Sequence, residues 1–191
     1  MNICVYAASS GLVSDAFSTA ARTLGAVIAQ RGHTLINGAG RTGLMAAATD
    51  GALAAGGKAI GVIPQFMIDH GWQHSRMTRL IVTPDMHSRK EKMAELADAC
   101  IALPGGVGTL EELLEIITWK QLGLFPNPIV VLNVGGYFEP LLQQLSRAVD
   151  EHLMRPLHKD LWCVAADPAA AVTLCEQTPQ WNPALTKFAA M

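Results

Sequence analysis

The sequence predicts an α/β fold in which a doubly wound parallel sheet carries helices on both faces, within a single domain. Strand-like and helix-like segments alternate along the 191 residues, which is typical of a parallel sheet. The expected strands are continuous apolar runs, as in a sheet that is buried on both faces. Half of the chain is hydrophobic and only 16% is charged, so a large core is expected. Together these observations indicate a Rossmann-like domain.

The first half of the chain contains four of the expected strands. Residues 2–7 (NICVYA) are apolar, and a helix follows from Ser14, a residue type that caps helix N-termini well. A second helix, rich in small residues, ends at Gly56 and Gly57. Residues 65–75 have no regular period. The other strands expected in this half are 33–36, 58–63 and 79–83.

The second half continues the alternation. Three strands are expected there, at 100–103, 129–132 and 162–165. Helices are expected at 86–97, from Thr109 onward, at 138–149 and at 167–175. We see no linker, so residues 1–178 are predicted to form the domain, and residues 179–191, which contain two prolines, an irregular C-terminal tail.

Composition argues against several classes of protein. Fourteen basic residues against sixteen acidic ones give a formal charge of −2, so no basic field is available for nucleic acid. The four cysteines are far apart in apolar runs, which predicts buried thiols and neither disulfides nor a metal site. No targeting segment is visible, and no apolar run approaches the roughly 18 residues of a membrane span. We expect a cytoplasmic protein without nucleic-acid or membrane partners.

The strongest candidate site is the segment 104–109 (PGGVGT), which follows a strand and leads into a helix. Its three glycines let the backbone approach a ligand, and the first amides of the helix lack internal partners. A phosphate fits this position, with Thr109 adding a hydroxyl. Glu111 and Glu112 follow, where acids also simply stabilise the helix dipole. Adjacent helical residues point about 100° apart, so we do not expect both to face one pocket.

Three weaker patterns lie at other strand ends. The segment 38–43 (GAGRTG) fits G-x-G-x-x-G but lacks the acidic residue of a dinucleotide site, so a tight turn and a ligand contact both stay open. Arg89, within the segment 86–90 (MHSRK), could grip a phosphate or carboxylate, although a basic run is more often a solvated helix face. Ser9 and Ser10 suit either a phosphate or an ordinary turn.

In combination, the segments 86–90 and 104–112 resemble the LONELY GUY (LOG) family of cytokinin riboside 5′-monophosphate phosphoribohydrolases, often mislabelled lysine decarboxylases. The first is similar to the family's MHxRK motif and the second to its PGGxGTxxE motif. The segments 61–64 (GVIP) and 132–137 (LNVGGY) also resemble the family, and the likeness covers residues 2–167. The paired motifs in this order and spacing are far more specific than either alone.

The resemblance implies hydrolysis of the N-glycosidic bond of adenosine 5′-monophosphate, or its N6-modified form, to a free base and ribose 5-phosphate. It implies that Arg89 and Glu112 are the catalytic pair, and it implies a homodimer. The residues expected to bind the substrate are Ser9, Gly40, Met86, Arg89, Lys90, Gly105, Gly106, Val107, Gly108, Thr109 and Glu111.

The helix that follows Thr109 independently predicts a homodimer. It is apolar on more than one face, and such helices are buried on both sides. Leu110, Leu113, Leu114 and Ile117 can cover the sheet. That leaves Ile116 and Trp119 to point elsewhere, either toward a second subunit or under the neighbouring helix 138–149 of the same subunit.

The label of decarboxylase predicts a pyridoxal phosphate lysine, but Lys58, Lys90 and Lys92 lie in no recognisable cofactor context. We therefore expect neither cofactor nor metal. Ala8, Ala39 and Arg41 depart from the family's usual glycines and leave the preferred base open. Two alternatives remain: a non-catalytic nucleotide- or cofactor-binding carrier of the same fold, and a salvage nucleosidase acting on other nucleoside monophosphates.

Overall fold

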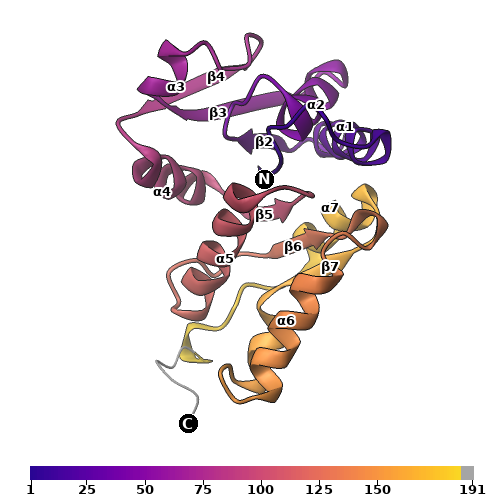
Figure 1. The fold of residues 1–191 in the computed structure, drawn as a ribbon, viewed down its shortest axis with the longest axis vertical. Coiled ribbons are helices and arrows are strands. Elements are labelled where there is room, and N and C mark those ends of the chain that lie inside the picture. The colour runs from indigo at the N-terminus through magenta and orange to yellow at the C-terminus, as the bar shows by residue number, and fades with distance from the viewer. Residues whose placement is uncertain (186–191) are drawn as a thin grey trace.

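The computed structural model describes residues 1–185, which form a seven-stranded sheet with every strand pairing parallel (Figure 1). The strand order is β4-β3-β2-β1-β5-β6-β7. The strands are β1 (Asn2–Tyr6), β2 (Thr34–Asn37), β3 (Lys58–Pro64), β4 (Arg79–Thr83), β5 (Ala99–Ala102), β6 (Ile129–Leu132) and β7 (Cys163–Ala165). The predicted fold class is confirmed, and each expected strand is found within one residue of its predicted bounds.

The winding of the sheet reverses beside its central strand. The chain moves outward from β1 through β2 and β3 to β4, then crosses back so that β5 pairs with the other side of β1. Ligands in open α/β sheets bind beyond the carboxyl ends of the strands at such a reversal. The topology therefore directs attention to the loops after β1 and β5.

Helices α1 (Asp15–Gln30), α2 (Gly43–Ala54) and α7 (Pro168–Gln177) cover one face of the sheet. Ser14 caps α1 as predicted, because its hydroxyl accepts a hydrogen bond from the Phe17 amide. Helices α1 and α2 cross closely at two glycines. A Cβ on Gly25 would lie 1.9 Å from the Ala48 carbonyl oxygen, and one on Gly51 would lie 2.0 Å from that of Arg22.

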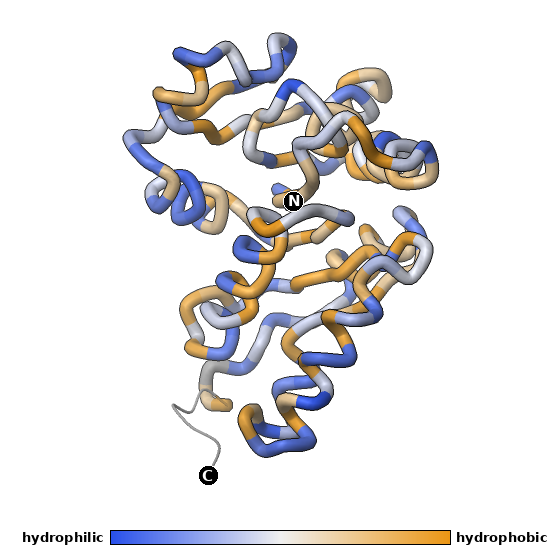
Figure 2. Tube along the Cα trace, viewed as in Figure 1, coloured by the Kyte–Doolittle hydropathy of each residue, from blue (hydrophilic) through white to orange (hydrophobic). Residues whose placement is uncertain are grey.

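The other face is covered by α4 (Met86–Leu96), α5 (Val107–Gln121), α6 (Glu139–Asp150) and the 3-10 helix η2 (Pro156–Leu161). Met93, Leu113 and Phe138 are buried in this layer. Hydrophobic and hydrophilic residues alternate along α6 in Figure 2, as in a helix with one face on the core.

Helix α5 differs from its prediction in two respects. It begins at Val107, two residues earlier than expected, so Val107 and Gly108 belong to its first turn. The predicted division of its faces is also wrong. Ile116 is 2% exposed and packs inside the subunit in the same cluster as Phe138, which is the alternative left open for it, whereas Leu114, expected to cover the sheet, is 38% exposed.

Four short elements within residues 1–185 were not predicted, among them η2 and the 3-10 helix η1 (Val134–Gly136). Helix α3 (Gln65–Asp69) lies in the stretch without a regular period, and the 3-10 helix η3 (Pro183–Leu185) lies in the predicted tail 179–191. Residues 186–191 of that tail are outside the described part of the chain. Within residues 1–185, no helix combines the length and the apolar character needed to cross a membrane.

Candidate active site

A cavity of about 360 Å³ opens at the carboxyl ends of the strands, where the winding reverses between β1 and β5. A pocket of this size accommodates a small organic ligand. Nine of the site residues expected from the sequence line it: Ser9, Met86, Arg89, Gly106, Val107, Gly108, Thr109, Glu111 and Glu112. The other three, Gly40, Lys90 and Gly105, lie outside its lining.

The N-terminus of α5 offers the cavity a set of free amides. Within residues 1–185, the backbone amides from Gly106 to Thr109 donate to no protein acceptor, and the helix dipole adds partial positive charge there. Thr109 is 4% exposed and packs directly on Gly105, where a Cβ would lie 2.1 Å from the threonine hydroxyl oxygen. Glycine at 105 therefore lets the loop fold tightly onto the helix.

The N-terminus of α2, by contrast, is occupied by the protein itself. The amides of Leu44 and Met45 both donate to the Ala8 carbonyl oxygen, at 2.9 and 3.3 Å. Gly43 adopts a positive φ of 67° against the loop after β1, and a Cβ there would lie 2.6 Å from the Ala8 oxygen. Of the two alternatives left open for the segment 38–43, the structure favours the turn, which ties neighbouring loops together.

Arg89 is buried in the cavity wall, at 5% exposure, so the alternative of a solvated helix face is wrong for this residue. Its Nε donates to the Val62 carbonyl at 3.2 Å and its Nη2 to that of Gly38 at 3.3 Å. A Cβ on Gly38 would lie 1.5 Å from Nη2, so glycine is needed for the guanidinium to pass. Because arginine has five N–H donors, these contacts leave others for the cavity.

Glu112 lies in the first turns of α5 and is half-buried. Burial raises the pKa of its carboxyl to about 7, with Arg89 and Lys90 opposing that rise and Glu111 and Glu115 adding to it. In the described part of the chain no ion pair joins Glu112 to Arg89. A carboxyl group with such a pKa populates both protonation states near neutral pH, as proton transfer requires.

Lys90 lies outside the cavity lining, is 8% exposed, and pairs with two carboxylates. Its ammonium lies 2.5 Å from the Glu111 carboxylate and 3.1 Å from that of Glu115. Burial lowers the pKa of Lys90, but these two hydrogen bonds outweigh burial and the pKa is raised. Glu111 and Glu112 line the same cavity, contrary to the expectation from their helical spacing, yet Lys90 pairs with Glu111 alone of the two.

Three methionines, Met45, Met67 and Met86, give the cavity apolar surface. Of the three, the sequence predicts only Met86 as a site residue. Met67 lies on α3, within the stretch that has no regular period, and nothing in its residue type signals a site. Gly40 leaves room for the Met45 side chain, because a Cβ on Gly40 would lie 2.6 Å from the Met45 methyl carbon.

Sequence relatives agree on one family. The profile described as "Possible lysine decarboxylase" matches residues 45–175. Cytokinin riboside 5′-monophosphate phosphoribohydrolase LOG5 of Arabidopsis thaliana is 37% identical over 174 residues, or 91% of this chain and 76% of the relative. This chain belongs to the LOG family. LOG7 of the same plant, which carries the same enzyme name, is 38% identical over 181 residues, or 95% of this chain and 82% of the relative.

Among solved structures, one with a similar fold is named as a carrier protein and not as an enzyme. The molybdenum cofactor carrier protein of Chlamydomonas reinhardtii superposes on the LOG-family chain with a TM-score of 0.70 and 25% sequence identity. The match covers 92% of this chain and 96% of the carrier. The LOG-family fold therefore also occurs in a protein named as a carrier.

A decarboxylase that uses pyridoxal phosphate needs a lysine in its active site, so the positions of the lysines in this LOG-family chain test that description. Lys58 begins β3 at the surface, Lys92 pairs with Glu95, and Lys90 is held by Glu111. Lys120, which no sequence pattern singles out, is 1% exposed, and burial lowers its pKa. Within residues 1–185, no lysine lines the cavity, and no three His, Cys, Asp or Glu side chains group as a metal site requires.

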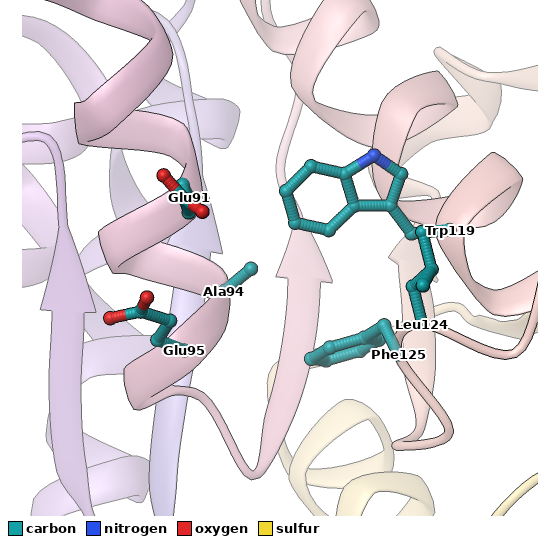
Figure 3. Close-up of a pocket in the computed structure, with 6 residues that line it drawn as sticks. All are labelled: Glu91, Ala94, Glu95, Trp119, Leu124 and Phe125. Atoms are coloured by element: carbon teal, nitrogen blue, oxygen red, sulfur yellow. The ribbon is translucent and has the colours of Figure 1, made fainter.

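A second hollow, of about 330 Å³, lies between α4 and α5 and is named here the α4–α5 groove (Figure 3). Ala94 of α4 faces Trp119 and Phe125 across it. Leu124 is 69% exposed beside them, and the remaining lining residues are Glu91 and Glu95 of α4. The groove thus has an apolar side and an acidic side.

Proposed function

We propose that this chain hydrolyses the N-glycosidic bond of adenosine 5′-monophosphate, or of its N6-modified form, to the free base and ribose 5-phosphate. The observation that carries the proposal is one cavity that combines an open helix N-terminus with a carboxyl group of pKa about 7. The enzyme name shared by LOG5 and LOG7 supports the same reaction.

The amides of Gly106, Val107 and Gly108, with the Thr109 hydroxyl, would bind the 5′-phosphate. Their free N–H groups and the dipole of α5 suit an anion. Gly105 would keep this loop close to the helix. Ser9 lines the same cavity from the loop after β1 and would bind the phosphate or the ribose.

Glu112 would act on the ribose and on water. Cleavage builds positive charge on the ribose ring, and a carboxylate stabilises that charge. The oxygen of water bonds to C1′ as the C1′–N bond breaks, and the electrons of that bond leave with the base. The proton lost by water passes to Glu112, and overall the base gains it. Arg89 would orient the phosphosugar with the donors that its backbone contacts leave free.

The requirement for the 5′-phosphate is the first prediction. The purified chain is incubated with a panel of nucleoside 5′-monophosphates and with the matching nucleosides, and released bases are separated by chromatography. We expect base from adenosine 5′-monophosphate or an N6-substituted form and far slower release from the nucleoside, because only the nucleotide engages the open helix N-terminus. Equal rates on both would contradict the assignment of residues 105–109.

The same panel separates the alternatives. The carrier named among the structural neighbours suggests a chain that binds a phosphate compound without turnover. Bound nucleotide recovered intact would support that carrier, whereas fastest release from other nucleoside monophosphates would support a salvage nucleosidase. The positions of Arg89 and Glu112 at the cavity favour the enzyme, since a carrier needs neither.

We also propose a homodimer that buries the α4–α5 groove. Leu124 lines the groove and is exposed, and Leu114 of α5 and Leu122 at its C-terminal end are exposed as well. Apolar surface of this kind beside a groove is typical of a protein interface. The cytoplasmic location stays a prediction from the sequence.

A further inference from the structure

Tyr137 reaches from the turn after β6 to the glycine loop after β5. Its hydroxyl donates a hydrogen bond to the Gly105 carbonyl oxygen at 2.6 Å. Tyr137 does not line the cavity, but Gly106, the next residue of the loop, does. The side chain therefore holds the candidate phosphate loop from outside the site.

The turn is built to present this tyrosine. Gly135 and Gly136 adopt positive φ values of 60° and 74°, a conformation that glycine adopts without strain. The Asn133 side chain accepts a hydrogen bond from the Phe138 amide at 2.7 Å and closes the turn. The asparagine and both glycines belong to the segment 132–137, which the proposed reaction leaves without a role.

Aromatic packing limits the motion of the tyrosine ring. Its centroid lies 5.6 Å from that of Phe17 on α1, at an interplanar angle of 78°. The Phe138 ring packs against it in the same edge-to-face manner at 5.1 Å. Edge-to-face contacts of this kind stabilise one ring orientation. The hydroxyl is consequently fixed although the side chain is 41% exposed.

A fixed carbonyl also fixes the next amide. The peptide unit is planar and trans, so the N–H of Gly106 points opposite to the carbonyl of Gly105. With the carbonyl turned toward Tyr137, the Gly106 amide is turned away from it. That amide has no acceptor among residues 1–185.

We propose that Tyr137 is a positioning residue that orients the Gly105–Gly106 peptide so that the Gly106 amide meets the 5′-phosphate of the substrate. The proposal rests on the function proposed above. Tyr137 acts through the backbone and does not touch the substrate.

The test is Tyr137→Phe, which keeps the ring and removes only the hydroxyl. Binding of ribose 5-phosphate is measured by calorimetry, together with kcat and KM for adenosine 5′-monophosphate and kcat/KM for adenosine. We expect Kd and KM to rise about fivefold to tenfold, the effect of one hydrogen bond. We expect kcat and the adenosine reaction to stay within about twofold, because phosphate binding is shared by ground and transition states.

Thr173→Val is the matched control. It removes a hydroxyl that donates to the Ala169 carbonyl at 3.0 Å on α7, far from the glycine loop, and that also accepts from Arg31 at 2.9 Å. It should leave Kd for ribose 5-phosphate unchanged. Melting temperatures are recorded for both variants.

An unchanged Kd in Tyr137→Phe, with or without a lower melting temperature, would overturn the inference while wild-type turnover leaves the proposed function standing. Equal losses on nucleotide and nucleoside would also overturn it, since they indicate a general structural role. Wild-type protein that binds no ribose 5-phosphate and releases no base would overturn both proposals.

Discussion

Arg89 illustrates how a buried charge constrains distant residues. Its guanidinium donates to the carbonyl oxygens of Gly38, just after β2, and of Val62, within β3, and it leaves no room for a side chain at Gly38. The sequence suggests a residue that is free to act at the surface of a helix start. The structure places it in the wall of the cavity, so truncating Arg89 would remove a candidate catalytic group and two backbone contacts together.

Glu112 allows a cleaner test of catalysis. We expect Glu112→Gln to lower kcat/KM by about 10²- to 10⁴-fold, because the amide cannot accept a proton from water. In the wild type, kcat/KM should rise with pH through about 7 as the carboxylate forms. Both quantities come from base release across a pH series. Turnover near the wild-type rate in the variant would point to Glu111 instead.

The same carboxyl predicts an effect on stability. Its folded pKa of about 7 lies above the ordinary value of 4.5, so the folded state keeps a proton that the unfolded state loses. Its contribution to stability therefore falls as pH rises from about 4.5 to 7. We expect Glu112→Gln to be more stable than the wild type at pH 8, by on the order of 2 kcal/mol, and equal to it at pH 4. Urea unfolding at both pH values measures the difference; a variant less stable at pH 8 would contradict the environment described for Glu112.

At the scale of elements, the crossing of α1 and α2 depends on two missing side chains. A methyl group on Gly25 would meet the backbone of α2, which cannot move aside as a side chain can. We expect Gly25→Ala to lower the free energy of unfolding by about 3 kcal/mol, measured by urea denaturation.

Gly11→Ala is the matched control for that prediction. Gly11 lies on the loop after β1, and a Cβ on it would have no other atom within 4 Å. Its substitution should change stability by less than about 0.5 kcal/mol. Equal effects of the two substitutions would mean that the crossing does not govern the result at Gly25.

Helices α2 and α5 show that similar sequence patterns serve different ends. Both begin after a glycine-containing turn at the end of a strand. The first amides of α2 are used by Ala8, whereas those of α5 are free within residues 1–185. The Ala8 carbonyl, from the loop after β1, thus occupies the N-terminus of α2 and, of the two helices, leaves only that of α5 open to an anion.

For the whole molecule, the prediction to be tested is that two copies of the chain form a homodimer through the α4–α5 groove. We expect light scattering to give a dimer at micromolar concentration and Trp119→Glu to shift it toward monomer, because Trp119 lines the α4–α5 groove. Leu124→Glu should do the same with less risk to the fold, since Leu124 is 69% exposed.

Leu153→Glu serves as the control for the dimer. Leu153 is 77% exposed and lies after α6, outside the groove, so a charge there should leave the oligomer unchanged. A monomeric wild type would refute the dimer. A dimer that survives both groove substitutions would refute this choice of interface.

Local patterns along the chain predict the sheet, its helices and the loops that carry the candidate site. Apolar runs, capping residues and glycines act over a few neighbouring residues, so they can be interpreted along the chain. Thus Ser14 was identified as a cap, and the segment 104–109 as the loop before a helix.

The groups that each of these residues contacts depend on how distant segments pack together. The burial of Arg89, the pairing of Lys90 with Glu111, and the bond from Tyr137 to Gly105 join segments 21 to 51 residues apart. The pKa of Glu112 likewise depends on groups from two helices and on the depth of the cavity. Burial and charge act through space, and no local pattern records which distant groups the fold brings together.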